Sequence, residues 1–502
     1  MTAVRRIVTP VLLLAVAFAA LLGSNYLNNQ FHENLGEVAT DDSVPPGVGT
    51  PLVSTRRLTP LLAPSLTQSD FFDVLDELMA TAPSSACVHV TLDGRGTTFH
   101  ESNASIQVMP TEALLLPTLA AAHKELGPDY TFTTWVMSIA PKEDGVVNGD
   151  IYLVGGGDPL LLTPDYLATL DEGANRLHTP IEALAQQLVD FGLVLVTGAV
   201  VGDATLFSEL PYVPSWPASV IEDQQIGTQL GLQFNDGWVQ FPVPDLAEEG
   251  EEVVEEATEE AAGYHVAEDP PFFAAALFDD MLEARDVVIR RSPRSEAIPE
   301  QDVTHILGSI ESAPLSDYYD QILDNRDIET TELLVKTIGR FTTGVGSTRA
   351  GLQAIDNVLA RIGIDSEQSQ FLQFDGSGLD PANVATCSVF TTLLDSDEFS
   401  PFFHELLPTA AEDPSLQSRF AGVEDPGRIK AFSGGSSNAT AMIGYIDIGR
   451  GQEMTFAFIA NQQDASDNKA LRDLENRIVR HLATLRAKPS LDDIGLEPLQ
   501  VG

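Results

Sequence analysis

Residues 86–100 have the sequence ACVHVTLDGRGTTFH, and this stretch decides the predicted fold. Two runs with alternating apolar residues flank a glycine-containing turn at 93–96, a pattern typical of a β-hairpin. Two more strand-like stretches follow near the end of the chain, at 428–448 and 453–461. We expect the first and the last strands to share one sheet.

Helical patterns surround these strands in the sequence. SDFFDVLDELMATA (69–82) has apolar residues at helical spacing behind a Ser/Asp cap, so a helix is expected to begin near Ser69. An Ala/Leu helix is predicted over 109–126, opened by Pro110. Later helices are predicted at 315–323, 331–341, 350–362 and 469–487. The pattern predicts an α/β domain with helices packed on a sheet.

A different pattern interrupts this domain. From about 131 to 310 the chain has short β runs broken by Gly and Pro, such as GDIYLVGGGDP (149–159). This pattern indicates a β-rich insertion. We therefore divide the chain into an α/β domain, inserted β-rich domain or domains, and a tail. The α/β domain is assigned to 66–148 together with 311–488, the inserted domain or domains to 149–310, and the tail to 489–502.

The N-terminus is hydrophobic. Arg5 and Arg6 precede a charge-free run from 7 to 23, whose length lies between that of a signal-peptide core and that of a full membrane span. We predict an uncleaved anchor at 1–23 with the arginines inside and the rest exported; a cleaved signal on a secreted protein and a core helix are the alternatives. Residues 24–65 have the Asn, Pro, Ser and Thr content of a flexible linker.

The chain is strongly acidic. Its 502 residues include 27 basic and 74 acidic side chains, for a formal net charge of −47. Such a chain lacks the basic stripe with which nucleic-acid binders neutralise phosphates, so nucleic-acid partners are excluded. Eight glutamates fall in DLAEEGEEVVEEATEEAA (245–262), which is either a solvated loop or a segment that docks a partner or cations.

Metal and cofactor sites are not predicted. The nine His are scattered without a His-x-x-x-His pair, and no Cys-x-x-Cys occurs. The glycine run at 155–157 lacks the Lys of a phosphate-binding loop and indicates a strand-ending turn. Cys87 and Cys387 are 300 residues apart and either form a disulfide or stay as buried thiols.

Seven stretches between about 70 and 490 stand in an order and spacing that match a known family. They are GPDYTFTTWV (127–136), GDIYLVGGGDPLL (149–161), VTGAVVGDATLF (196–207), DPPFFAAALFDDML (269–282), ELLVKTIGR (332–340), FDGSGL (374–379) and PSLQSRF…GRIKAFSGG…IGYI (414–446). With them the chain resembles the class C penicillin-binding proteins, the exported serine-type D-Ala-D-Ala carboxypeptidases/endopeptidases. The resemblance implies a penicillin-recognising α/β domain, a sheet between helices, with domains inserted between its first two active-site motifs.

The family's chemistry needs three motifs. In Ser-x-x-Lys the nucleophile sits at a helix N-terminus and the Lys, one turn on, reaches its hydroxyl. Ser-x-Asn supplies a proton-shuttling hydroxyl and an amide that holds the substrate. Lys-Thr-Gly lies on a strand whose edge pairs with the peptide, while its cation and hydroxyl hold the terminal carboxylate.

The first two motifs are degenerate in this chain. Counted from Gly127-Pro128, the Ser and Lys positions fall on Glu112 and Leu115. Counted from ELLVKTIGR, the Ser-x-Asn positions begin at Arg326 and end at Ile328. The nucleophile, its amine and the substrate-holding amide are therefore all replaced.

The third motif is reduced. Counted from PSLQSRF, Lys-Thr-Gly becomes Phe432-Ser433-Gly434. Only a hydroxyl and a glycine survive, so Ser433 and Gly434 are weak candidates for binding substrate.

Other side chains in the sequence are weaker candidates for the nucleophile. A shifted register places Thr111 at the nucleophile, but its partner three residues on is Leu114, which has no amine. A literal Ser-x-x-Lys begins at Ser466, but this segment follows the last strand and is expected to cap the final helix. Ser377 matches the family's structural turn. Glu112 itself would be a poor nucleophile, and its attack on an amide would have to form a mixed anhydride.

The replacements favour a filled cleft. We predict that Leu115, Ile328 and Phe432 pack together where substrate would lie, with Glu112 paired to Arg326 beside them. The sequence thus predicts a cell-envelope pseudoenzyme of the family that binds peptidoglycan peptides or a cell-wall protein. The alternatives are an active serine-type carboxypeptidase that cleaves stem peptides and a structural envelope protein.

Overall fold

The computed structural model describes residues 64–92, 94, 96–170, 176–208, 210–222, 226–241, 264–299, 304–365, 371–462 and 468–486. The predicted anchor, the linker up to residue 63, the acidic stretch 245–262 and the tail from 489 lie outside these ranges. Among the described residues, none of the helices combines the length and the apolar character that a membrane crossing requires.

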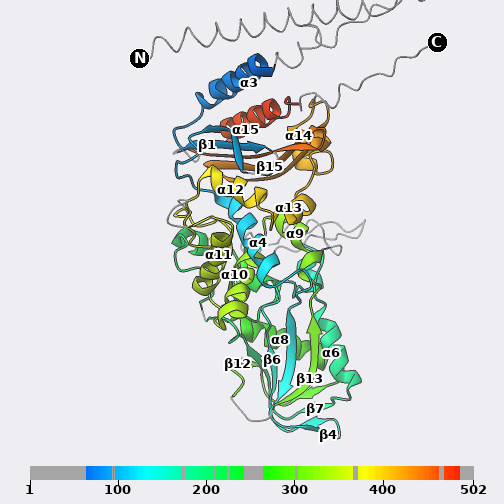
Figure 1. Cartoon of the computed structure of the whole chain (residues 1–502). Helices are drawn as coiled ribbons and strands as arrows, with labels where there is room; N and C mark the ends of the chain where they lie inside the picture. Colours follow the sequence, from blue (N-terminus) through cyan, green and yellow to red (C-terminus); the bar gives the residue numbers. More distant parts are fainter. Residues whose placement is uncertain are drawn as a thin grey trace, which may run out of the picture. The chain divides into compact units, whose positions relative to one another are not determined.

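One five-stranded sheet joins the two ends of the described chain (Figure 1). Its order is β14-β15-β16-β1-β2, and every neighbouring pair is antiparallel. The strands are β1 (Ala86–Leu92), β2 (Thr97–Ser102), β14 (Ile429–Ser436), β15 (Ala439–Gly449) and β16 (Gln452–Asn461). The prediction that the first and last strands share a sheet is confirmed, although the stretch 428–448 contains two strands that turn at 437–438.

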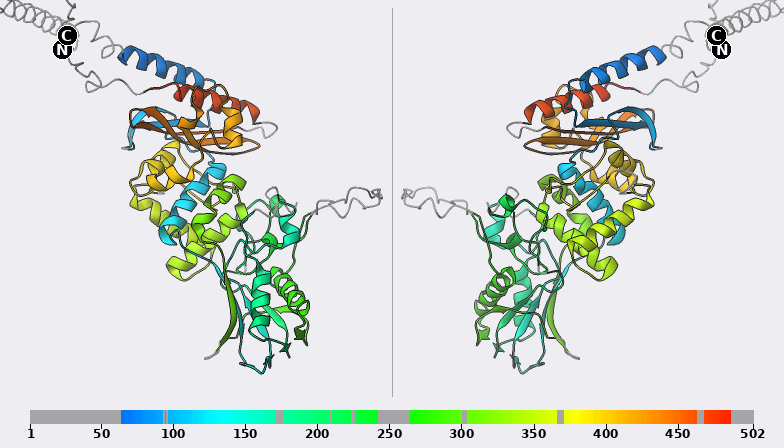
Figure 2. Two further views of the ribbon diagram at one scale, coloured as in Figure 1. Left: turned by 90° about the vertical axis from the view of Figure 1, so that its right-hand side faces the viewer. Right: turned by 90° about the vertical axis from the view of Figure 1, so that its left-hand side faces the viewer.

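Helices cover both faces of this sheet, as Figures 1 and 2 show. One face packs against α3 (Pro64–Met79) and α15 (Lys469–Leu482), and the other against α12 (Cys387–Asp395) and α4 (Leu115–Glu125). Strand β1 is consequently buried on both sides, with Val88 and Val90 in one core and Cys87 in the other. Helix α3 begins at Pro64, so the predicted cap at Ser69 is wrong because the helix continues through that residue.

The remaining helices of the α/β domain are divided between the core that contains α4 and the core that contains α3 and α15. They are η1 (Thr111–Leu114), η5 (Leu315–Asp317), α9 (Tyr319–Asn325), α10 (Ile328–Thr343), α11 (Thr348–Arg361), α13 (Ser400–Leu406), α14 (Pro414–Arg419) and η6 (Pro426–Arg428). Helix α10 starts three residues before the predicted 331 because the Asp327 side chain accepts from the Thr330 N–H and caps it. It ends at Gly344, whose φ of 81° suits glycine.

The inserted segment contains the other sheets. One has the order β12-β8-β6-β3-β13, a second β11-β7-β5-β4, and a third pairs β10 with β9. The strands are β3 (Thr133–Ser138), β4 (Lys142–Glu143), β5 (Val146–Val147), β6 (Ile151–Val154), β7 (Leu195–Val196), β8 (Val200–Asp203), β9 (Trp238–Gln240), β10 (His265–Val266), β11 (Val288–Ile289), β12 (Arg294–Ser295) and β13 (His305–Glu311). The helices are α5 (Pro164–Leu167), α6 (Ile181–Asp190), α7 (Ala218–Glu222), η3 (Asn235–Gly237) and α8 (Pro270–Glu283).

The first strands of these sheets precede the boundary predicted at 149. Strand β3 pairs with β6 and β13, and β5 pairs with β7. Residues 133–147 therefore belong to the sheets of the inserted segment, because backbone pairing across a sheet overrides the local pattern on which the boundary was placed.

A disulfide connects the sheet to the helices below it. Cys87 on β1 and Cys387 at the start of α12 are bonded, with their Cα atoms 6.0 Å apart. Nearby, Thr91 on β1 and Thr455 on β16 both donate to the buried carboxylate of Asp395 on α12. The question that the sequence left open, pairing or two thiols, is thus resolved as pairing.

Candidate active-site remnant

Glu112 lies at the start of the helix where the family's nucleophile is expected. It belongs to the short helix η1, which runs directly into α4. The preceding Thr111 has a φ of 53°, which is unusual for a β-branched residue. A Cβ on Gly378 would lie 1.7 Å from the Thr111 carbonyl oxygen, so only glycine permits the 375–378 turn to support η1 this closely.

Arg326 reaches the same place from the junction of α9 and α10. It adopts a left-handed backbone with a φ of 51°, which ends α9 and precedes the cap of α10. Its Nε lies 3.2 Å from Glu112 Oε2, and its Nη1 donates to the Asp324 carbonyl at 2.8 Å. The predicted ion pair between Glu112 and Arg326 is therefore confirmed.

Both charged side chains also bind the outer edge of β14, the edge strand of the main sheet. The Arg326 Nη2 donates to the Ser433 carbonyl at 2.6 Å, and the Gly435 N–H donates to Glu112 Oε2 at 3.0 Å. Gly434 lies between them and must be small, since a Cβ there would approach Glu112 Cβ to 3.1 Å. The Glu112–Arg326 pair thus satisfies the backbone groups that an added peptide strand would use.

Further hydrogen bonds are made near both ends of β14. The Ala410 N–H donates to the Ile429 carbonyl at 2.8 Å and the Ala431 N–H to the Pro408 carbonyl at 3.1 Å. At the other end, the Asn468 side chain donates to the Ser436 carbonyl. Sequence reasoning missed this occupied edge, because its partners come from four separate parts of the chain.

Burial shapes the electrostatics of Glu112. Its partial removal from water raises the pKa of the carboxyl, against the opposing effects of the Gly435 N–H and of Arg326. Glu112 still has 26% of its side chain exposed and Arg326 has 35%. The pair is accordingly a partly solvated contact and not a sealed one.

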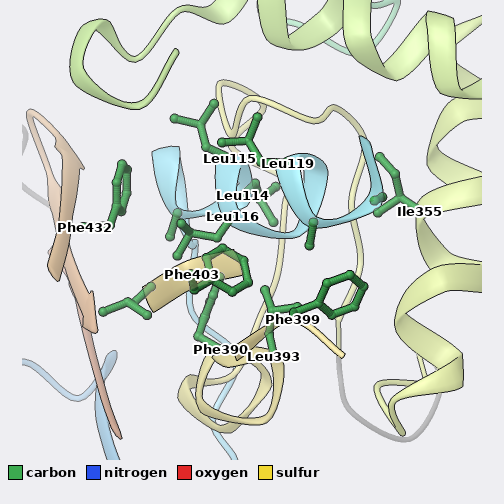
Figure 3. Close-up of a cluster of buried hydrophobic side chains, with 14 of the residues drawn as sticks. Leu114, Leu115, Leu116, Leu119, Ile355, Phe390, Leu393, Phe399, Phe403 and Phe432 are labelled. Carbon is green, nitrogen blue, oxygen red and sulfur yellow. The ribbon is translucent and has the colours of Figure 1, made fainter. Parts of the chain in front are cut away.

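Two of the three apolar replacements come together. Leu115 and Phe432 are both buried in the core beneath the sheet, and Figure 3 shows the Phe432 ring beside the first turn of α4. The Arg326 guanidinium lies 5.9 Å from the centre of that ring. A fully buried Leu115 has no room for a solvated amine at this position.

The third replacement, Ile328, was predicted wrongly. It packs in a different cluster, with Val213, Trp216 and Ile226 of the inserted segment. The reason is that Arg326 turns the chain and Asp327 caps α10, so that the next side chain points toward the inserted segment instead of toward β14.

Ser433, the surviving hydroxyl of the third motif, is engaged by a second arginine. Arg419 at the end of α14 donates to Ser433 Oγ and pairs with Glu475, a fully buried carboxylate on α15. A third contact runs from Arg419 Nε to Asn476 Oδ1 at 2.8 Å. The hydroxyl and the carbonyl of Ser433 therefore each accept from a guanidinium, which ties Ser433 to two arginines.

The other candidate nucleophiles lie in structural positions. Ser377 is buried, and the N–H groups of Gly376 and Ser377 donate to Glu332 Oε1, each at 2.9 Å. Burial, with Asp375 nearby, raises the pKa of Glu332 to about 8. Thr111 is buried and its hydroxyl has no hydrogen-bond partner among the described residues. Ser466 lies outside the described residues.

The space beside the Glu112–Arg326 pair is small. A cavity of about 280 Å³ follows the β14 edge and is lined by residues that include Asp324, Arg326, Ser415, Ala431 and Ser433.

Two further sequence features lie elsewhere in the structure. Among the described residues, the acidic side chains that approach one another closely enough to share a metal ion are those of Asp279, Asp280 and Glu283 on α8. The glycine run at 155–157 follows β6 and ends at the buried Asp158, a strand-ending turn as predicted.

Replacing Arg326 tests the contact with β14. We expect Arg326→Ala to lower the free energy of unfolding by no more than about 1 kcal/mol, because the pair is partly exposed. Exchange of the Gly435 amide with solvent should nevertheless accelerate, since its acceptor Glu112 loses its counter-charge. Hydrogen exchange read by mass spectrometry measures this.

The control for that measurement is Arg361→Ala, which removes an ion pair with Glu125 away from β14. We expect it to have a similar effect on stability and none on the Gly435 amide. Equal exchange at Gly435 in both variants would contradict the contact.

The chain is similar to known proteins along most of its length. The model of the D-Ala-D-Ala carboxypeptidase 3 (S13) family matches residues 74–268 and 256–485. A D-alanyl-D-alanine carboxypeptidase from Actinomadura sp. (strain R39) is 26% identical over 439 residues, covering 75% of this chain and 78% of the relative. The carboxypeptidase DacB of Mycolicibacterium smegmatis is 23% identical over 438 residues, covering 85% of each chain.

Among solved structures, penicillin binding protein 4 (dacB) from Haemophilus influenzae superposes with a TM-score of 0.65 at 17% identity, covering 82% of this chain and 99% of that one. The likeness confirms the predicted fold class, a penicillin-recognising α/β domain with an inserted β-rich segment. Since the family model matches most of the sequence, from residue 74 to residue 485, the chain belongs to the D-Ala-D-Ala carboxypeptidase 3 (S13) family.

Proposed function

We propose that this chain is a cell-envelope member of its family that has lost serine acylation and acts by binding or scaffolding at the cell wall. The observation that carries the proposal is Glu112, a carboxylate held by Arg326 and the Gly435 N–H where the nucleophilic hydroxyl would stand. An ionised or hydrogen-bonded carboxylate cannot replace a serine activated by an amine.

The missing amine supports the same conclusion. Leu115 is 1% exposed and packed in the core, so nothing at its position can take the proton of a nucleophile. In serine proteases, loss of the nucleophile alone lowers the rate by about 10⁶-fold, and the remaining donors recover only a small part. Here the nucleophile, its base, the substrate-holding amide and the cation of the third motif are replaced.

The partners that we propose are peptidoglycan peptides or a cell-wall protein. The family relation supports wall peptides, since the matched relatives are named D-Ala-D-Ala carboxypeptidases. Because the β14 edge is already bonded, a peptide would have to displace Glu112 and Arg326 to add there as a strand. We propose an envelope location for the same reason, with the hydrophobic segment 1–23 as the anchor.

The decisive experiment is acylation by a β-lactam. We expect the purified chain, incubated with a fluorescent penicillin, to show no covalent adduct on a denaturing gel or by intact mass. The Actinomadura carboxypeptidase, labelled in parallel, controls for the reagent. An adduct on this chain, mapped to any serine or to Thr111, would refute the loss of acylation.

The binding half of the proposal has its own test. We expect the chain to co-sediment with purified peptidoglycan without releasing D-alanine. The variant Glu112→Ala with Arg326→Ala, which frees the β14 edge, should strengthen any binding of a D-Ala-D-Ala peptide measured by calorimetry. Failure to co-sediment would remove the wall as the partner.

An active carboxypeptidase is the second candidate, favoured by the names of the matched relatives. It would need groups other than those at the three motif positions. Release of D-alanine from stem peptides, abolished by one serine replacement, would establish this candidate in place of the first.

A further inference from the structure

The first turn of α10 is joined to the inserted segment through buried charged side chains. Asp327 Oδ2 accepts from Arg176 Nη2 at 2.8 Å, and Oδ1 caps the helix by accepting from the Thr330 N–H at 2.9 Å. Glu329 Oε1 accepts from the Gly227 N–H at 2.9 Å. Since Arg176 and Gly227 belong to the inserted segment, these bonds join it to α10.

A third carboxylate completes the cluster. Asp236, in a left-handed turn with a φ of 55°, accepts from the Tyr166 hydroxyl at 3.0 Å. Its backbone carbonyl accepts from the Thr228 N–H at 2.9 Å, which fixes the loop that presents Gly227 to Glu329. The cluster therefore holds three carboxylates, one phenol and one guanidinium.

The charges in this cluster do not balance. In the described part of the chain, the ionisable groups whose interactions meet here are Tyr166, Arg176, Asp236, Asp327 and Glu329. Arg176 is 12% exposed and directly paired with Asp327, which is 7% exposed. One cation can neutralise one carboxylate, so the cluster has two acids in excess.

Protons can remove that excess. Burial, followed by the Asp327 charge, raises the pKa of Glu329 to about 7 and that of Asp236 well above its ordinary value. In the neutral form both groups can be buried without repelling Asp327. Ionised, they repel it and each other in a medium that screens charge poorly.

We propose that this cluster is a pH-sensitive junction, which holds the inserted segment on α10 while Glu329 and Asp236 are protonated and loosens when they ionise. Because the folded pKa of Glu329 exceeds the ordinary 4.5, the contact is strongest below about pH 4.5 and weakens as pH rises to about 7. Ionisation of Asp236, whose pKa is also raised by burial, adds to the weakening. The junction adjoins Arg326, so loosening also reaches the side chain that binds the β14 edge.

The test is hydrogen exchange of the full chain between pH 5 and 8, corrected for the intrinsic pH dependence of exchange. We expect the opening constant of the Gly227 and Thr228 amides to rise by up to tenfold per pH unit for each proton released. In Glu329→Gln this rise should shrink or vanish, because the neutral amide keeps the shape without the charge.

The control is Glu332→Gln, one turn along the same helix. Glu332 is also a buried acid, but it binds the 376–377 turn and not the inserted segment. It should leave the pH dependence at Gly227 intact. Two results would overturn the proposal: an opening constant at Gly227 that does not change with pH in the wild-type chain, or a pH dependence that is unchanged in Glu329→Gln. If the variant does not fold, the wild-type series alone decides the question.

Discussion

Removing the disulfide with Cys87→Ala and Cys387→Ala is expected to lower the free energy of unfolding by about 5 kcal/mol. The bond closes a loop of 300 residues, and in the chain-entropy model a loop of this length gives close to the largest stabilisation that a disulfide provides. It also holds strand β1 against α12 across the whole inserted segment. Urea denaturation of the oxidised and the variant protein measures the difference.

Two controls separate the crosslink from simple packing. Val389→Ala removes methyl groups from α12 at a buried site without touching the bond, and we expect a loss of only about 1–3 kcal/mol. Reducing the wild-type protein should reproduce the effect of the double variant. A loss below about 1 kcal/mol on removing the disulfide would show that packing alone holds β1 on α12.

Replacing Arg419 by methionine is expected to lower the free energy of unfolding by about 3–5 kcal/mol at neutral pH. Arg419 is the charge partner of Glu475, whose carboxylate is 0% exposed, and removing one member of a buried pair leaves the other uncompensated. Burial already raises the pKa of Glu475. Without Arg419 it would rise further, so the loss should shrink at acidic pH, where the carboxyl is neutral.

The matched variant for that measurement is Arg419→Met combined with Glu475→Met. Replacing both charges by apolar side chains of similar length should recover much of the stability, since no unpaired charge remains. Ser433 loses its guanidinium in both variants, so any change common to the two is assigned to the hydroxyl. Equal losses in the single and double variants would show that the ion pair does not control stability here.

The degree to which the site was predictable differs between its residues. Glu112 and Arg326 could be paired from sequence, because the family resemblance placed them at neighbouring motif positions and their charges are opposite. Ile328 could not be placed, since its direction depends on the left-handed backbone of Arg326 and on the cap formed by Asp327. Arg419 belongs to the stretch PSLQSRF but to none of the three catalytic motifs, and nothing local indicates that it reaches Ser433.

The sequence by itself determined the main strands and helices and the family to which the chain belongs. Alternating runs at 86–100 and apolar periodicity at 109–126 specify strands and helices because these patterns match local backbone geometry. The residues counted to the motif positions likewise predict the loss of the acylating groups, and this prediction needs no coordinates.

Only the tertiary structure decided which side chains contact one another at the predicted site and at the start of α10. The bonding of the β14 edge depends on Glu112 and Arg326, while the junction at α10 depends on Arg176, Asp236 and Glu329. These groups are separated by up to several hundred residues in sequence. Their energies depend on distance and burial in the folded chain, which no local pattern encodes.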